Sequence, residues 1–170
     1  QSKKAGQAAS DMIDLEGISY YILDHMDKNQ GALYIIGPGT TTRAIKQKIG
    51  DKYTLLGVDV CQNKKFIALD ADESTLLQLL SGVQKAFIVV TIIGGQGYIF
   101  GRGNQQISPR VIRKVGLENI IVIATRNKVS ALGYNPLLVD TGDEELDQAL
   151  CGYVRVVTGY LEQRLMKVSI

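Results

Sequence analysis

Glycine and threonine residues that follow a short apolar run form the clearest chemical signal in this sequence. The run YIIGPGTTTRAI places five of them in one turn: Gly37, Gly39, Thr40, Thr41 and Thr42. Glycine lets the backbone approach an anion closely, and a helix that begins after the turn would point free N–H groups at that anion. The alternative interpretation is a tight bend in which a threonine caps the helix. The turn is not a Walker A motif or a Rossmann fingerprint, because the lysine of the first and the third glycine of the second are absent.

A second glycine-rich segment, GGQGYIFGRGNQQISP, carries further polar groups. We expect it to face a ligand, and its candidate residues are Gly94, Gly95, Gly97, Arg102, Gly103, Asn104 and Gln105. The amides offer neutral donors and acceptors, and the planar guanidinium of Arg102 suits phosphate or carboxylate. The alternative is a simple bend with a structural ion pair at Arg102. Asp59, in the string GVDV, is a candidate acceptor for a sugar hydroxyl, with an exposed loop carboxylate as the alternative.

The composition excludes several other kinds of site. The single histidine, His25, and the two distant cysteines, Cys61 and Cys151, provide no metal-ligand spacing and no triad. We therefore expect no metal ligand and no catalytic residue in this chain. A formal net charge of +2 with scattered basic residues argues against a nucleic-acid partner. No apolar segment approaches the roughly 20 residues that a membrane span needs, and no signal peptide is apparent. We expect a cytoplasmic protein without membrane contact.

The elements that must position these residues follow from the hydrophobic pattern. Short apolar runs predict buried strands at 32–37, 53–60, 86–93, 119–125 and 136–142, with a returning strand after a turn at 63–65. Helices are predicted at 11–27, 40–50, 72–82, 108–116 and 143–150, and a short helix or turn at 127–132. The last segment, 153–169, has the alternating character of an antiparallel hairpin.

This alternation of strands and helices predicts an α/β three-layer sandwich with a mostly parallel, Rossmann-like sheet and an antiparallel C-terminal hairpin. Residues 11–170 are expected to form a single α/β domain, and residues 1–10 have the composition of a linker or of the cut edge of a longer protein. In such sheets ligands collect beyond the carboxyl ends of the strands. The two glycine-rich segments and Asp59 should therefore open onto one shared pocket.

Five segments of the chain resemble a known family. LYIIGPGTTTRAI, TLLGVDV, VTIIGGQGYIFGRGNQQISPRVIRKVG, NIIVIAT and VDTGDEELDQALCGYVRVVTGY lie between about residues 32 and 160. Together they are similar to the C-terminal half of archaeal and bacterial ATP–NAD kinase-like proteins, in the NAD kinase and diacylglycerol kinase superfamily. The resemblance implies transfer of a phosphoryl group from ATP or polyphosphate, with magnesium, to the adenosine ribose of NAD, which yields NADP.

The resemblance also indicates what this chain lacks. The Gly-Gly-Asp-Gly motif of the superfamily belongs to an N-terminal domain, and its aspartate is expected to activate the acceptor hydroxyl and help to hold magnesium. The nearest string here is Gly94-Gly95-Gln96-Gly97, and a glutamine cannot act as a base. The chain therefore resembles the C-terminal half of a two-domain enzyme. Alone it is expected to bind an NAD- or ATP-type molecule without turnover, and the missing N-terminal domain is its expected partner.

Two other interpretations stay open at this point. The GPGTTTRAI turn and the GVD string also resemble the phosphate-binding turn of ribose-5-phosphate isomerase and of sugar-responsive transcription regulators, which implies a sugar-phosphate-binding domain. The sequence offers neither a suitably spaced acidic residue and lysine for an isomerase nor a helix-turn-helix for a regulator. The third interpretation is an interaction domain, whose apolar C-terminal strands complete the sheet of another domain or form a homo-oligomer.

Overall fold

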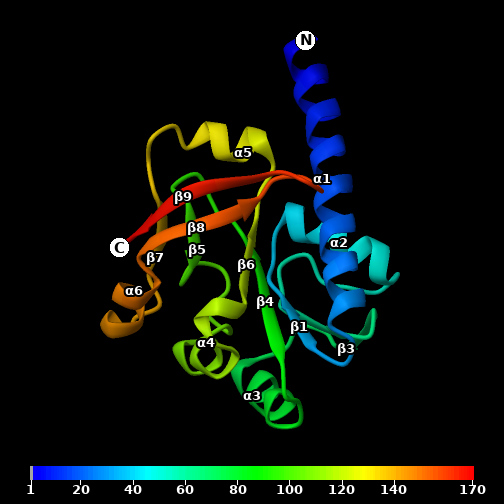
Figure 1. Ribbon diagram of the computed structural model, residues 1–170, viewed down its shortest axis with the longest axis vertical. Helices are drawn as coiled ribbons and strands as arrows, with labels where there is room; N and C mark the ends of the chain where they lie inside the picture. The colour runs from blue at the N-terminus through cyan, green and yellow to red at the C-terminus, as the bar shows by residue number, and fades with distance from the viewer. Residues whose placement is uncertain (1) are drawn as a thin grey trace.

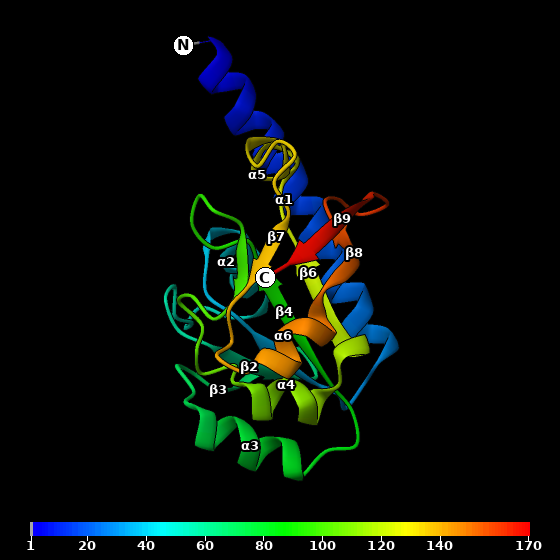
Figure 2. The ribbon, with the colours of Figure 1, turned by 90° about the vertical axis from the view of Figure 1, so that its left-hand side faces the viewer.

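A nine-stranded mixed β-sheet runs through the centre of the fold, with helices on both of its faces (Figures 1 and 2). The computed structural model describes residues 2–170. Its strands are β1 (Leu33–Ile36), β2 (Asp59–Gln62), β3 (Lys65–Ala68), β4 (Ala86–Thr91), β5 (Tyr98–Phe100), β6 (Ile120–Ile123), β7 (Leu137–Val139), β8 (Gly152–Val157) and β9 (Gln163–Ser169). Five of the eight neighbouring strand pairs are parallel, and β8 and β9 form an antiparallel hairpin. The predicted α/β class with a mostly parallel sheet is therefore confirmed.

The order of the strands across the sheet is β3-β2-β1-β4-β6-β8-β9-β7-β5. The parallel strands β1, β4, β6 and β8 lie next to one another and end at the same edge. β2 runs antiparallel to β1, so its first residue, Asp59, lies beside Ile36, the last residue of β1. The strand direction reverses between β8 and β9, and β7 and β5 follow β9 in parallel.

The helices begin and end largely where capping residues predict. They are α1 (Ser2–Lys28), α2 (Thr40–Ile49), α3 (Glu73–Ser81), α4 (Pro109–Val115), α5 (Arg126–Ala131) and α6 (Glu144–Leu150), with a 3-10 turn, η1 (Leu117–Asn119). Asp72 caps α3 by accepting from the N–H of Thr75, and Ser108 caps α4 by accepting from the N–H of Val111. A short polar acceptor before an apolar helix satisfies a backbone donor that the helix leaves free. Such local chemistry explains why the sequence predicts these boundaries well.

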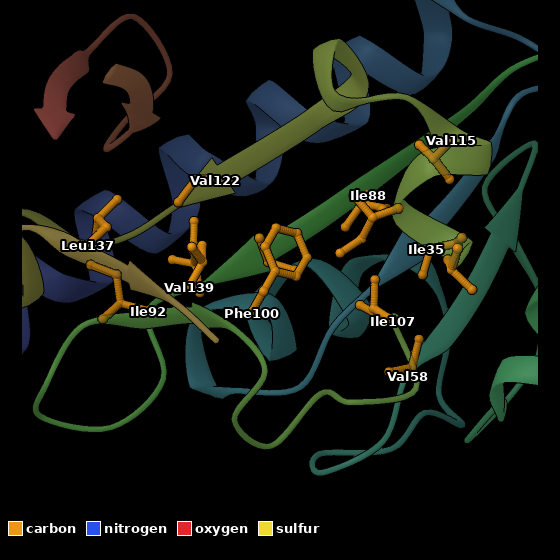
Figure 3. Packing of buried hydrophobic residues seen from close by; sticks show 14 of the residues in the cluster. Ile35, Val58, Ile88, Ile92, Phe100, Ile107, Val115, Val122, Leu137 and Val139 are labelled. Atoms are coloured by element: carbon orange, nitrogen blue, oxygen red, sulfur yellow. The ribbon is translucent and has the colours of Figure 1, made fainter. Parts of the chain in front are cut away.

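Two apolar layers cover the two faces of the sheet. On one face, Ile18, Ile22 and Met26 of α1 pack with Ile45 of α2 against β1 and β4. On the other face, Phe100 of β5 lies at the centre of a larger cluster, as Figure 3 shows, with several β-branched side chains around it. The labelled neighbours in this cluster are Ile35, Val58, Ile88, Ile92, Ile107, Val115, Val122, Leu137 and Val139. The central strands β1 and β4 are thus buried on both faces, which explains their almost wholly apolar sequences.

Helix α1 is longer than its hydrophobic spacing predicts. The predicted start at Ser10 and Asp11 is wrong, because the helix begins at Ser2. The residues before Ser10 are rich in Lys, Gln and Ala, which extend an existing helix at little cost. The N-terminal half of α1 projects beyond the rest of the fold (Figures 1 and 2). The assignment of residues 1–10 to a linker stays a prediction. Gln1 lies outside the described residues. No helix among residues 2–170 has the length and apolar character needed to cross a bilayer.

Two apolar or glycine-rich segments differ from their predicted structures. Of the strand expected at 53–60, only the residues from Asp59 onward pair with β1, and residues 53–58 form a loop. The loop lies over the β1–α2 turn, where the N–H of Gly39 donates to the carbonyl of Leu55. Conversely, the second glycine-rich segment contains the short strand β5, which pairs with β7. An apolar run of this length does not by itself distinguish a strand from a packed loop.

Candidate functional site

A pocket of about 400 Å³ lies at the edge where the parallel strands β1, β4 and β6 end. Side chains that follow these strands meet there, together with one face of α1, as expected for the carboxyl edge of a parallel sheet. We call it the threonine pocket, and its lining residues are Gln7, Asp11, Leu15, Thr40, Thr41, Thr91, Ile92, Thr125, Asn127, Lys128 and Ala131. The predicted residues Thr40 and Thr41 therefore do face a pocket.

The first turn of α2 leaves its backbone donors free on the side of this pocket. The N-terminal residue before the helix is Gly39, which has no side chain to cap it. The hydroxyl of Thr42 donates to the carbonyl of Gly39, so it does not cap the helix either. The N–H groups of Thr40, Thr41 and Thr42 have no acceptor among the described residues. Free N–H groups and the positive end of a helix dipole are the usual features of an anion site.

Thr91, the last residue of β4, supplies an independent sign of a ligand. Its side chain is only 3% exposed, and its Oγ1 is a buried polar atom with no hydrogen-bond partner among the described residues. A buried hydroxyl without a partner costs about 1–3 kcal/mol, so natural folds seldom keep one without a reason. Because Thr91 lines the threonine pocket, its hydroxyl is a candidate donor to a molecule bound there.

The far wall of the pocket consists of α5 and of the α1 residues that hold it. Arg126 donates through Nε and its backbone N–H to the buried carboxylate of Asp14, at 2.9 and 2.8 Å. Asn127 donates to Asp11 at 3.0 Å. The ammonium group of Lys128 has no ionic partner within residues 2–170. The wall thus adds a lysine without an ionic partner to the pocket that the first turn of α2 also lines.

Gly39 is required by the packing of the turn against Thr91. Its φ of +128° disfavours any other residue, and an added Cβ would lie 2.8 Å from Cγ2 of Thr91. We predict that Gly39→Ala lowers the free energy of unfolding by at least about 1 kcal/mol, because both the strained backbone and the close contact add to the cost. Urea denaturation would measure it. The control is Gly95→Ala, since no atom lies within 4 Å of an added Cβ there; an equal loss in both variants would contradict the explanation.

Asp59 lies at the predicted edge of the sheet, but the protein itself occupies its carboxylate. The side chain is fully buried and contacts Nζ of Lys46 at 3.0 Å. It also accepts from the N–H and hydroxyl of Thr54 and from the N–H of Asp70. Burial alone would raise the pKa of Asp59, but these hydrogen bonds outweigh it and lower the pKa below its ordinary value. The geometry gives Asp59 a structural role as the anchor of the 53–58 loop and leaves no oxygen for a sugar.

The second glycine-rich segment is also held mainly by its own contacts. Asn104 is fully buried, where it donates to the carbonyl of Ile99 and accepts from the N–H of Gly101. Arg102 forms a half-exposed ion pair with Asp140 at 3.1 Å and lies over the ring of Tyr98. These contacts match the structural alternative for Arg102. None of the residues predicted in this segment lines the threonine pocket: Gly94, Gly95, Gly97, Arg102, Gly103, Asn104 and Gln105.

Several polar residues of the pocket were not predicted from the sequence. Thr91 and Thr125 follow apolar runs that end at the same edge, so their positions carried a usable signal. No sequence signal placed Asp11, Asn127 and Lys128 in the pocket. They lie on α1 and α5, which are distant in the chain and meet only in the folded structure.

Magnesium does not fit the residues described here. Asp11 is the only carboxylate that lines the threonine pocket, and no group of three potential metal ligands occurs within residues 2–170. A magnesium site usually combines carboxylates with phosphate oxygens. We therefore assign the magnesium implied by the resemblance to no residue of this chain.

The fold and the pocket define an α/β domain with a polar cavity beyond the carboxyl ends of its parallel strands. A comparison with protein-family models matches residues 29–168 to the ATP-NAD kinase C-terminal domain. Because this match covers most of the chain, the protein belongs to that family, as the resemblance of its sequence implied. Comparisons with curated proteins and with solved structures gave no match.

Proposed function

We propose that this domain binds a phosphorylated nucleotide of the NAD or ATP type, with a phosphate group in the threonine pocket. The observation that carries the proposal is the buried hydroxyl of Thr91, which has no partner among the described residues and lines the pocket. The free N–H groups of Thr40 and Thr41 and the unpaired ammonium group of Lys128 lie around the same pocket. All of these groups donate hydrogen bonds, and a phosphate provides only acceptors.

The rest of the proposal concerns the complete enzyme. As a member of the ATP-NAD kinase C-terminal domain family, the chain would serve a cytoplasmic phosphotransferase that makes NADP from NAD with ATP or polyphosphate. Phosphoryl transfer depends on positioning and on charge stabilisation, and usually on a metal ion held by carboxylates. This domain supplies the positioning, and the carboxylates and magnesium belong to another part of the enzyme. The domain alone is therefore expected to bind ligand without turnover.

Calorimetric titration of this domain tests the proposal. AMP, ATP, NAD, ribose 5-phosphate and inorganic phosphate are titrated into the wild type and into Thr91→Val. We predict that the nucleotides bind and that Thr91→Val weakens them roughly tenfold or more, because a hydrogen bond to a charged group is lost. The same variant should not lose stability, since it removes a hydroxyl without a partner.

Two controls keep the result specific. Thr75→Val changes a threonine on α3, at the opposite end of the sheet (Figures 1 and 2). Arg102→Ala removes the guanidinium that pairs with Asp140. Both should leave nucleotide affinity unchanged. Affinities that are the same in wild type and Thr91→Val would contradict the proposed site. Binding of ribose 5-phosphate without any nucleotide would favour the sugar-phosphate interpretation.

A further inference from the structure

Asp11 brings a negative charge to a pocket whose other polar groups are mostly donors. It lies on the face of α1 that also presents Gln7 and Leu15 to the pocket, at spacings of four residues. Residues at this spacing lie one above the other on a helix, about 6 Å apart along its axis. Leu15 and Asp11 are partly buried, and Gln7 is exposed. Along this face of α1, Asp11 therefore lies between the partly buried Leu15 and the exposed Gln7.

The carboxylate of Asp11 is held in place through one of its two oxygens. Oδ1 accepts from Nδ2 of Asn127 at 3.0 Å, and the same amide nitrogen also donates to the carbonyl of Gln7 at 3.3 Å. Oδ2 has no hydrogen-bond partner among residues 5–170, the part of the chain whose side chains the structure describes. An ionised carboxylate only accepts hydrogen bonds, and it repels a phosphate. The lining of the pocket thus combines groups that donate to an anion with one carboxylate that accepts from a hydroxyl.

We propose that Asp11 binds the free 2′- and 3′-hydroxyls of a ribose phosphate unit whose phosphate lies against Thr91 and Lys128. This inference rests on the function proposed above and specifies the ligand further. A ribose phosphate carries an anion and two vicinal donors, which matches the two kinds of group in the lining of the pocket. Asp11 selects ribonucleotides over 2′-deoxyribonucleotides, and its charge disfavours a second phosphate on the ribose.

The test compares ligands that differ only at the ribose. AMP and 2′-deoxy-AMP are titrated into the wild type, Asp11→Asn and Asp11→Ala, with ribose 5-phosphate and 2-deoxyribose 5-phosphate as the base-free pair. We expect the wild type to prefer AMP by on the order of tenfold, the effect of one hydrogen bond to a charged group. In Asp11→Ala this preference should disappear. Affinity for inorganic phosphate should stay the same or rise, since a nearby negative charge is removed.

The matched control is Glu16→Gln, which removes a carboxylate from the same helix where it pairs with Lys48 instead of lining the pocket. It should keep the ribose preference. The amide of Asp11→Asn can still accept from Asn127, so this variant separates loss of charge from loss of the α1–α5 contact.

The outcomes distinguish the two proposals. If AMP and 2′-deoxy-AMP bind the wild type equally, and Thr91→Val weakens both, the role of Asp11 is wrong and the phosphate site stands. If no phosphate compound binds, the proposed function itself fails. A preference seen with AMP but not with ribose 5-phosphate would show that the ligand is a nucleotide and not a free sugar phosphate.

Discussion

Replacing Lys46 by methionine should lower the free energy of unfolding by about 3–5 kcal/mol, because it leaves a buried carboxylate without its counter-charge. Lys46 and Asp59 are both essentially inaccessible to solvent, and their charged atoms lie 3.0 Å apart. Burial lowers the pKa of Lys46, although the hydrogen bond and the charge of Asp59 act in the opposite direction. Its ammonium group also donates to the carbonyls of Thr54 and Gly57. One side chain thus holds β2 and the loop before it.

Urea denaturation at neutral pH would measure the loss, with a second lysine of α2 as the control. Lys48 pairs with Glu16 at 2.7 Å, but both side chains are partly exposed. Lys48→Met should therefore change stability little, since water replaces a surface partner. The double variant Lys46→Met/Asp59→Asn should recover part of the loss, because no uncompensated charge remains. Equal effects of Lys46→Met and Lys48→Met would contradict the structural role of the buried pair.

The pH dependence of this contribution has a definite sign. The folded-state pKa of Asp59 lies below its ordinary value, so its charged form stabilises the fold above the unfolded pKa. That stability is lost as the pH falls through the lowered pKa of the folded state. The effect of Lys46→Met on stability should therefore shrink in acid.

Replacing Asp14 by alanine should have the second largest effect, and it should act on stability and on ligand binding together. The carboxylate of Asp14 is buried and accepts from both the backbone and the guanidinium of Arg126. Loss of hydrogen bonds to a buried charged group costs about 1.5–3 kcal/mol. Because these bonds hold α5 against α1, the wall that carries Lys128 should also become mobile. We expect nucleotide affinity to fall more than tenfold.

Thermal unfolding and calorimetry, both on the same preparation, would check the two effects. Asp27→Ala is the matched control, since Asp27 lies on the same helix and pairs with Lys64 at the surface. It should change neither quantity by much. If Asp14→Ala destabilises the protein but binds nucleotide as the wild type does, then α5 does not form part of the site.

The sheet and the helix caps could be predicted from the sequence because the relevant signals are local. Apolar runs such as LYII in β1 are explained by burial on both faces. The caps at Asp72 and Ser108 depend on a residue and the helix that directly follows it. The glycine and threonine turn was predicted at the correct edge for the same reason.

For Asp59 the sequence predicts the position of the carboxylate but not its partners. Its place in the string GVDV indicates a carboxylate at the edge of the sheet, and that placement is correct. Its partner Lys46 lies on another element, so the sequence pattern does not reveal that the carboxylate is already neutralised. Arg102 is a similar case, because its partner Asp140 follows a strand that the glycine-rich segment contacts only after folding.

Thr91 and the α1–α5 contact escaped prediction for a different reason. A threonine at the end of an apolar strand is ordinary, and only the absence of a partner for its hydroxyl makes it notable. Asp14 and Arg126 are 112 positions apart, and neither belongs to a recognisable motif. Both features are properties of the packed structure and not of any sequence window.

The position of β9 has a consequence for how the protein folds. This strand is the latest in the chain, yet it lies inside the sheet between β8 and β7. β7 and β5 therefore join the other strands of the sheet through a strand that is synthesised after all of them. Pairing between distant segments is slow, since loop closure must precede the contacts that reward it. The half of the sheet that carries the threonine pocket can assemble before β9 is synthesised, whereas β5 and β7 complete their pairing only after it.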